Sequence, residues 1–185
     1  MIHPSHSQER PAYPAGLIRH VTLPDGRAVT IRPIRPEDTA IERDFVNSLS
    51  AHAKFQRFMF TLRELTPEML ARFTQIDYER EMALIAVLDT PQGERQVGVA
   101  RYARLPDDGQ SCEFAIVVAD DWQGKGLASQ LMKSLIAAAR DRGLRVMEGF
   151  RLLKNARMQD LARSLGFRSA ADPDDPQLVR MRLVL

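Results

Sequence analysis

The stretch DDWQGKGLASQLMKSLI, residues 120–136, constrains the fold of this chain more than any other. It joins a glycine-containing turn directly to a segment whose apolar residues recur at helical spacing, which predicts a long amphipathic helix from about Gly126 to Arg142. The β-rich run SCEFAIVV, residues 111–118, ends just before the turn. A strand, a turn and a helix N-terminus in this order can form an anion site, because the first helical N–H groups are unpaired and glycine lets a ligand approach the backbone closely.

The two glycines of the turn, Gly124 and Gly126, have a second interpretation, since a tight strand–helix turn uses glycine for its geometry alone. The phosphate motif GxxxxGK[ST] fails here, because Ala119 stands at the place of its first glycine and Gly126 at the place of its Ser or Thr. No GxGxxG motif occurs in the chain either. From the residues alone, both the anion site and the purely structural turn therefore stay open.

The segments around this unit predict one domain in which helices flank a central sheet. The predicted strands are two runs of a hairpin in LIRHVTLPDGRAVTIRPI, then EMALIAVL, RQVGVARYARL, SCEFAIVV, LRVMEGFRL and QLVRMRLVL. The predicted helices lie in RPEDTAIERDFVNSLS, in TPEMLARFTQI with Thr66 as N-cap, in the long helix and in NARMQDLARSLGF. Short connections favour an antiparallel meander, while the strand–helix–strand order around the long helix implies one parallel pair. The predicted fold class is therefore mixed α/β (α+β), with a mostly antiparallel sheet and about four helices.

The composition excludes several classes of protein. The chain has 185 residues, of which 44% are apolar and 27% charged, as expected for one soluble globular domain. No apolar run approaches the roughly 20 residues of a membrane helix. The polar, Pro-rich residues 1–16 lack the apolar segment of a secretory signal, and we expect them to form a loose tail before a domain over residues 17–185. A single cysteine, Cys112, excludes an internal disulfide and fits a cytoplasmic location.

Positive charge is concentrated in the later part of the chain, although the net charge is only +2. Residues 140–168 contain eight cations and only three acids. The cations are Arg140, Arg142, Arg145, Arg151, Lys154, Arg157, Arg163 and Arg168, and the acids are Asp141, Glu148 and Asp160. Such a run is either a solvated helix face or a patch that attracts a phosphorylated small molecule or nucleic acid. Because no aromatic residues that could stack on bases accompany the arginines, nucleic acid is not expected as a partner.

The turn and its flanks resemble a known family. Gln123-Gly124-Lys125-Gly126-Leu127-Ala128 resembles the Q/R-x-x-G-x-G/A signature of the GNAT superfamily of N-acetyltransferases. FAIVVADDWQG resembles the family's fourth strand with its acidic turn, and NARMQDLARSLGF its Asn-bearing helix. The early segments resemble, more narrowly, the acetyltransferase domain of bacterial Pat-type protein lysine acetyltransferases; these are IRPIRPED, Leu49-Ser50, Arg57-Phe58 and IDYEREMALIAV. The resemblance covers about residues 18–185.

This resemblance implies how a cofactor would bind. Acetyl-CoA would lie in a gap where the strand CEFAIVV splays from the strand LRVMEGF, with backbone groups of Ile116, Val117 and Val118 along its pantetheine arm. The N–H groups from Gln123 to Ala128 would hold the pyrophosphate, and the basic run after the turn could contact the remaining phosphate. Asn155 matches the family's cofactor-contacting Asn, although it could also simply cap its short helix. No metal is expected.

Glu113 is the candidate catalytic residue. Acyl transfer to an amine needs a neutral nucleophile, whereas a lysine side chain has a pKa near 10.4, so a general base assists the reaction. A carboxylate is unusual in the apolar run SCEFAIVV, and alternation places it on the face of Ala115 and Val117. The pattern alone equally allows a solvent-facing charge on a half-exposed strand. In the Pat-type domains a glutamate at the matching place is the proposed base, and a backbone N–H near Val117 is implied as the oxyanion donor.

The chain departs from the family at one place. Many members have a tyrosine that protonates the leaving thiolate, and here Ala162 stands in its position. The thiolate would then leave unassisted, or Ser164 or a water molecule would serve.

The remaining candidate residues favour structural roles. We expect Glu81 to be a surface ion-pair member, Cys112 a buried small hydrophobe and Trp122 a packing residue of the turn. Phe55, Phe58 and Phe60 are expected in the core, and the four isolated histidines show no metal-site spacing.

The sequence thus predicts a GNAT-fold enzyme that transfers acetyl from acetyl-CoA to a primary amine, with a protein lysine as the expected acceptor. A small amine or an N-terminal amine is the alternative acceptor. A non-catalytic acyl-CoA sensor is the alternative from another class, and it would have no need of a base at Glu113. The oligomeric state and the acyl-chain preference are not predicted.

Overall fold

The computed structural model describes residues 12–185 apart from residues 59–61, 63 and 107–108. Eight strands within these residues form one sheet in the order β1-β2-β3-β4-β5-β6-β8-β7. The strands are β1 (Arg19–Thr22), β2 (Ala28–Pro33), β3 (Glu81–Thr90), β4 (Gly93–Arg104), β5 (Ser111–Val118), β6 (Val146–Leu152), β7 (Arg168–Ala171) and β8 (Leu178–Val184). The helices are α1 (Thr39–Ser48), α2 (Ala51–Phe58), α3 (Pro67–Thr74), α4 (Leu127–Asp141) and α5 (Ala156–Ser164), with 3₁₀ turns η1 (Ala15–Leu17), η2 (Pro36–Asp38) and η3 (Asp120–Trp122). The predicted mixed α/β class is confirmed.

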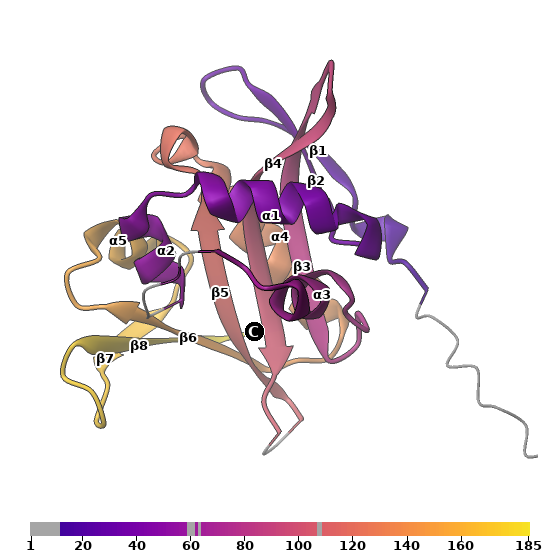
Figure 1. Ribbon diagram of the computed structural model, residues 1–185. Helices are drawn as coiled ribbons and strands as arrows, with labels where there is room; N and C mark the ends of the chain where they lie inside the picture. The colour runs from indigo at the N-terminus through magenta and orange to yellow at the C-terminus, as the bar shows by residue number, and fades with distance from the viewer. Residues whose placement is uncertain (1–11, 59–61, 63, 107–108) are drawn as a thin grey trace, which may run out of the picture.

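The helices cover the two faces of the sheet. Figure 1 shows α1, α2 and α3 in front of the central strands and α4 behind them. The apolar stripe of α4 is fully buried at Leu127, Leu131 and Leu135, as its helical spacing predicted. Gly98 on β4 lets this helix approach, because a Cβ there would lie only 3.0 Å from Leu131 Cδ1. The face of β4 and β5 that carries Gly98 and Val118 is therefore the α4 face.

The strands β5 and β6 form the predicted parallel pair, but only at their beginnings. Ser111–Glu113 pairs with Val146–Glu148, and no pairing follows beyond these residues. Figure 1 shows β5 then running upward while β6 runs to the left with β8 and β7. Phe114 occupies the start of the divergence, since a Cβ on Gly149 would lie 2.7 Å from its ring, and the ring packs on Phe167 at 5.1 Å. A gap between two strands of one sheet results.

Two elements of the fold were not predicted. No element was predicted over helix α2, and β7, whose four residues are all exposed, shows no alternation in the sequence. The Thr66 N-cap of α3 is confirmed, because its hydroxyl accepts the Met69 N–H at 3.3 Å. Residues 1–11 of the expected tail lie outside the described residues. The Tyr13 hydroxyl, by contrast, donates to the Pro33 carbonyl at 2.9 Å, and its ring meets the Tyr78 ring edge to face.

A buried group of charges joins β2, η2 and β4. Arg32 and Asp38 are 3% and 4% exposed, and they form a double hydrogen bond of 2.7 and 2.8 Å. Arg32 also donates to Glu94 at 2.6 Å, and Asp38 accepts the Arg35 N–H at 2.8 Å. In such a bidentate pair, two guanidinium N–H groups donate to the two carboxylate oxygens, so donors and acceptors are satisfied together. We call Arg32, Asp38 and Glu94 the closed charge group.

In the described part of the chain, no helix is both long enough and apolar enough to cross a membrane.

Candidate active site

The turn before α4 has the backbone geometry that its glycines suggested. Gly124 and Gly126 have φ angles of 73° and 87°, in the left-handed region that favours glycine. Gly126 is the N-cap of α4, and no side chain caps the first turn of this helix. A Cβ placed on Gly124 would meet nothing within 4 Å. The first N–H groups of α4 are thus without a side-chain acceptor, and the turn is open to a ligand.

Contacts from three directions hold this turn. The Gln123 amide donates to the Val118 carbonyl at 3.2 Å, and Arg157 on α5 donates to the Gln123 Oε1. Trp122 is buried beneath the Arg27 guanidinium at 4.0 Å, which confirms its packing role. The side chain of Gln123 is therefore occupied by protein groups, and its backbone N–H donates to the Asp120 carbonyl at 3.4 Å.

The turn is also tied to the helices on the opposite face. Asp120 accepts the Ser50 N–H at 2.9 Å and the Ser50 hydroxyl at 2.8 Å. The same hydroxyl oxygen accepts the Ala53 N–H at 3.1 Å in the first turn of α2. One serine thus couples the start of α2 to the acidic turn, and these residues lie 70 positions apart in the sequence.

The backbone of β5 offers hydrogen-bonding groups to the gap beside β6. The N–H of Ala119 donates to Val97 on the β4 side, and the register from Gly98↔Val118 to Arg104↔Cys112 is continuous. Because directions alternate along a strand, the N–H of Val117 points to β4, while those of Ile116 and Val118 point to the gap. A backbone donor to a substrate in the gap is therefore expected at Ile116 or Val118 rather than at Val117.

Three residues of the α5 region have clear structural positions. Asn155 caps α5, since its Oδ1 accepts the Met158 N–H at 3.1 Å, which confirms the capping interpretation. Ala162, at the place of the family's tyrosine, is fully buried. The exposed Ser164 hydroxyl donates to the Leu161 carbonyl at 2.8 Å.

Glu113 lies at the point where β5 and β6 separate. Its side chain is exposed and shares the face of Ala115 and Val117, as alternation predicted. The register places Glu148 of β6 directly beside it. Among the described residues neither carboxylate has a hydrogen-bond or ion-pair partner. Partial burial raises the pKa of Glu113, the neighbouring Glu148 charge raises it further, and Arg57 opposes both by lowering it.

A cavity of about 280 Å³ opens beside Glu113 on the face of α1, α2 and α3. Its lining includes the charged side chains Arg57, Glu81, Arg101, Arg104 and Glu113. The expectation that Glu81 is a surface ion-pair member is wrong, because it is half-buried in this cavity and has no ion-pair partner in the described part of the chain. Phe58 packs against the core, Phe55 is 41% exposed and so not in the core, and Phe60 lies outside the described residues.

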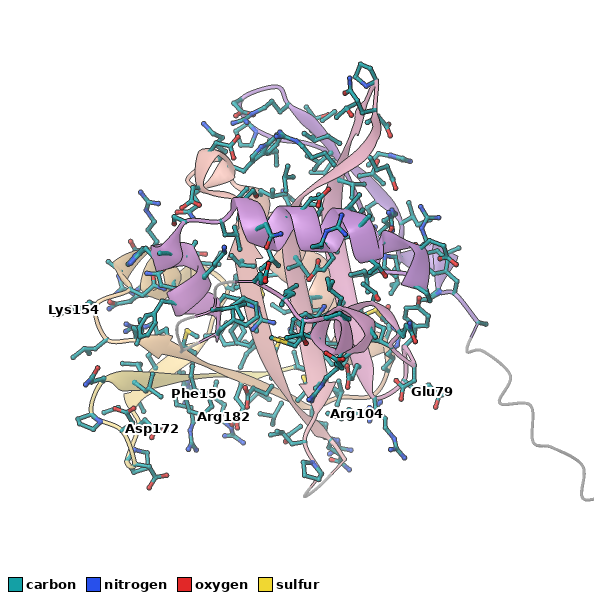
Figure 2. The ribbon with its side chains drawn as sticks, viewed as in Figure 1. Glu79, Arg104, Phe150, Lys154, Asp172 and Arg182 are labelled. Atoms are coloured by element: carbon teal, nitrogen blue, oxygen red, sulfur yellow. The ribbon has the colours of Figure 1, made fainter. Side chains whose placement is uncertain are left out.

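A second cavity, of about 520 Å³, lies at the loop before β3. Its arginines are already engaged: Arg104 donates to the Glu79, Gly109 and Arg142 carbonyls, and Arg142 donates to the Tyr78 carbonyl. Figure 2 places Glu79 and Arg104 together at the end of β4, away from Lys154 and from the β6–β8 side chains Phe150, Asp172 and Arg182. None of the predicted site residues lines this cavity.

The basic run does not form one patch. Arg151 is buried and donates to the Leu152 and Leu153 carbonyls, Arg142 bonds to the Tyr78 loop, and Arg163 lies near Asp160. Arg157 is the member that reaches the turn, through Gln123. In the described residues no three His, Cys, Asp or Glu side chains are arranged as a metal site. Cys112 is fully buried, and burial raises its pKa to about 12, which confirms its role as a small hydrophobe.

Sequence reasoning missed Arg57, Arg101 and Glu148 as members of the site. Arg57 and Arg101 come from α2 and β4, and only the folded arrangement brings them to Glu113. Glu148 stands in an alternating strand, where the one available signal was a charged residue between Met147 and Gly149.

Comparison with known proteins gives a consistent result. A family model described as "Acetyltransferase (GNAT) domain" matches residues 28–168. The acetyltransferase PA5475 of Pseudomonas aeruginosa is 43% identical over 164 residues, which cover 89% of this chain and 88% of that protein. The acetyltransferase Pat of Mycolicibacterium smegmatis is 26% identical over 146 residues, which cover 79% of this chain and 43% of that protein.

Solved structures agree with this. The GNAT domain of S. lividans PAT superposes with a TM-score of 0.86 and 28% identity, covering 94% of this chain and all of that domain. The yncA protein of Salmonella typhimurium, solved with its cofactor acetyl-CoA, superposes with a TM-score of 0.68 and 26% identity, covering 85% of this chain and 94% of that one.

Proposed function

The chain belongs to the GNAT family of acetyltransferases, and on this premise we propose that it transfers acetyl from acetyl-CoA to a primary amine, the side chain of a protein lysine, with Glu113 as general base. The observation that carries the proposal is the position of Glu113. It has no hydrogen-bond or ion-pair partner in the described part of the chain, and it lies at the point where β5 and β6 separate, on the same strand that leads into the open turn of α4.

The turn and the gap fit acetyl-CoA as the co-substrate. The N–H groups from Gln123 to Ala128 would hold the pyrophosphate, since α4 has no side-chain cap and Gly124 is open to an approaching group. The backbone of Ile116 and Val118 would pair with the pantetheine arm along the gap, and Asn155 lies at the start of α5 nearby. Bound acetyl-CoA supplies an activated thioester. The structure of yncA with its cofactor acetyl-CoA supports the proposal.

Glu113 would take a proton from the attacking amine, directly or through a water molecule. The new C–N bond forms as the C–S bond breaks, and the amine proton goes to the carboxylate. A raised pKa makes a carboxylate a better base, and both burial and Glu148 raise the pKa of Glu113. Ala162 cannot donate a proton, so the thiolate would leave without a side-chain acid at the family's tyrosine position.

The protein-lysine acceptor is supported by the resemblance to Pat-type domains and by the exposure of Glu113, which a side chain on a protein surface could reach. A small amine or an N-terminal amine would use the same base. A non-catalytic acyl-CoA sensor would need the turn but not the carboxylate, and the unpaired Glu113 argues against it.

The test is free-thiol release from acetyl-CoA with a panel of lysine-bearing proteins and small amines, for the wild type and for Glu113→Gln. We expect the variant to bind acetyl-CoA normally in calorimetry and to turn over roughly 10²-fold more slowly, as loss of a general base requires. Glu79→Gln, an exposed carboxylate outside the predicted site, is the matched control and should behave as wild type. Equal turnover by wild type and Glu113→Gln would refute the base. Acetyl-CoA binding without thiol release for any acceptor would favour the sensor.

A further inference from the structure

The cavity beside Glu113 contains two guanidinium groups that the proposed reaction does not use. Arg57 comes from the last turn of α2 and Arg101 from the middle of β4. Both line the same cavity of about 280 Å³, together with the carboxylates of Glu81 and Glu113 and the apolar Ile76. The cavity thus combines a candidate base with two fixed cations.

Arg57 is a partly buried cation with no hydrogen-bond acceptor among the described residues. Its guanidinium lies 4.9 Å from the Phe58 ring, and no described residue accepts a hydrogen bond or forms an ion pair with it. Burial lowers its pKa to about 10, and the neighbouring Arg101 lowers it in the same direction, so Arg57 remains a cation at neutral pH. None of its nitrogen atoms is among the buried unpaired ones, so its donors remain accessible, and a partly desolvated guanidinium is stabilised by a partner that supplies oxygen atoms.

Arg101 is only partly satisfied. It donates through Nη2 to the Phe73 carbonyl at 3.0 Å and stacks over the Phe73 ring at 4.6 Å. Its Nε is buried and has no hydrogen-bond partner in the described residues. The Phe73 contacts fix the direction of the side chain. Nη1 is neither among the buried atoms nor hydrogen-bonded to a described residue, so this is the donor that Arg101 offers to the cavity.

Within the described residues, the nearby carboxylates form no hydrogen bond or ion pair with Arg57 or Arg101. Glu42 attracts both electrostatically, but it is buried on α1 and accepts the Gln96 amide at 2.5 Å. Glu113 also attracts Arg57, but the two side chains form no ion pair, and the pKa of Glu113 is raised rather than lowered overall. If Arg57 served only to neutralise Glu113, we would expect its guanidinium to contact the Glu113 carboxylate.

The arginines are also badly placed for the phosphates of a nucleotide cofactor. Glu113 and the end of β5 at Val118 are five residues apart, about 16 Å at the rise of an extended strand, and the open turn lies beyond that end. A diphosphate held at the turn would lie far from Arg57. Whatever anion these arginines bind must therefore come with the molecule that enters the cavity next to Glu113.

We propose that Arg57 and Arg101 bind a carboxylate carried by the acceptor, so that the substrate of this enzyme presents an acidic group close to the amine that receives the acetyl group. The inference rests on the proposed function, because it takes Glu113 as the base for that amine. Guanidinium groups bind carboxylates through paired, charge-assisted hydrogen bonds, and the two in this cavity have free donors on the same side as the base. The acceptor carboxylate has two sources, an amino acid-like small molecule or an acidic side chain beside the lysine of a protein.

The experiment measures kcat/KM for matched acceptors by thiol release. The small-molecule arm uses β-alanine, 4-aminobutyrate and 6-aminohexanoate, each beside its carboxamide. The peptide arm uses the blocked tripeptides Glu-Lys-Glu and Gln-Lys-Gln. We expect the carboxylate member of at least one pair to be preferred by ~10-fold or more, the effect of a charge-assisted contact. The arm in which this preference occurs identifies the source of the carboxylate.

Arg57→Gln should abolish this preference without changing the KM for acetyl-CoA. Arg57→Lys should restore this preference in part, since lysine keeps the positive charge but lacks the paired donors of a guanidinium. Arg43→Gln, on the exposed Arg43–Asp44 pair of α1, is the control and should leave the ratio unchanged. The melting temperature of Arg57→Gln should not fall, because the variant removes an unpaired, partly buried cation.

The outcomes separate the two proposals. If carboxylate and carboxamide acceptors react equally well in both arms, or if Arg57→Gln keeps the preference, the inference is overturned and the acetyltransferase proposal stands. If no acceptor of either arm or of the wider panel releases thiol from wild type, the proposed function fails and the inference fails with it. A loss of rate in Arg57→Gln that is equal for both members of a pair would point to an effect on Glu113 and would also overturn carboxylate recognition.

Discussion

Two groups of charged side chains lie on the sheet, and they differ in how completely they are paired. In the closed charge group, Arg32 and Asp38 are almost fully buried and every contact is mutual, with Glu94 as the third member. Around Glu113, by contrast, Arg57 and Glu148 have no hydrogen-bonded partner in the described part of the chain. We call Arg57, Arg101, Glu113 and Glu148 the open charge group.

The difference indicates what each group is for. A buried ion pair that satisfies itself contributes order to the fold, and removing one member leaves the other uncompensated. Charges that stay unpaired in a cavity lower stability, and proteins keep such groups where binding or catalysis uses them. Mutations in the closed charge group should therefore lower the stability of the protein. Mutations in the open charge group should instead change its activity.

The largest expected effect is on stability and comes from breaking the closed group. Asp38→Ala leaves Arg32 buried with Glu94 alone and removes the acceptor of the Arg35 N–H, so we expect a loss of about 3 kcal/mol or more in the free energy of unfolding. Urea denaturation measures it. Asp44→Ala is the matched control, since it breaks the exposed Arg43–Asp44 pair and should cost less than about 1 kcal/mol. Equal losses in the two variants would show that the closed group does not hold the fold.

The second prediction tests whether the glycine turn before α4 only shapes the backbone or also binds acetyl-CoA. Gly126→Ala forces a Cβ onto a residue with φ of 87°, at a cost of roughly 1–2 kcal/mol in stability. It should also weaken acetyl-CoA binding, measured by calorimetry, because the strained turn shifts the N–H groups that face the ligand. Gly16→Ala, where the added Cβ meets nothing within 4 Å, is the control and should change neither quantity. Normal acetyl-CoA affinity in a destabilised Gly126→Ala would argue that the turn is structural only.

A third, smaller effect compares two helix caps. Asn155 and Thr66 each accept one N–H in the first turn of a short helix, from Met158 and Met69. Replacing either by alanine should cost about 1 kcal/mol in the free energy of unfolding. If Asn155 also contacts the cofactor, only Asn155→Ala should weaken acetyl-CoA binding beyond what its lost stability explains. The same affinity in both variants would leave Asn155 with capping alone.

The same contrast explains what could be predicted from the sequence. Helix α4, its glycine turn and the strands with regular alternation were predictable because their signals are local: a 3.6-residue period, positive-φ glycines and turn residues between β-rich runs. Glu113 stood out because a carboxylate is unusual in an apolar strand. Helix α2 was missed because it is only eight residues long and follows the previous helix after two residues.

The open charge group was not predictable as a group, since its members come from α2, β4, β5 and β6. Their proximity depends on the register of a parallel pair and on the crossing of a helix over a sheet, and neither is encoded in local spacing. The Arg32–Asp38 pair is closer in sequence, but its burial depends equally on β4 and Glu94.

The last and smallest predicted effect concerns the open charge group and is measured as the pH dependence of kcat/KM. As a base, Glu113 works when it is deprotonated, so kcat/KM rises as the pH increases through its pKa. Glu148→Gln removes the like charge that raises this pKa, and the rise should move to lower pH. Arg57→Gln removes the cation that lowers it, and the rise should move to higher pH. Arg101 on β4 and Glu81 on β3 also face Glu113 and are unchanged in both variants.

These two shifts must have opposite signs, and this requirement makes the test sharp. A purely structural disturbance would have no reason to move the profile in opposite directions for two residues on either side of the same carboxylate. The shifts should shrink at high salt, because both neighbours are only partly buried and screening weakens their interaction with Glu113. Shifts of the same sign, or profiles that coincide with wild type, would mean that the titrating group is not Glu113. The unpaired charges would then have to be explained by acceptor binding alone.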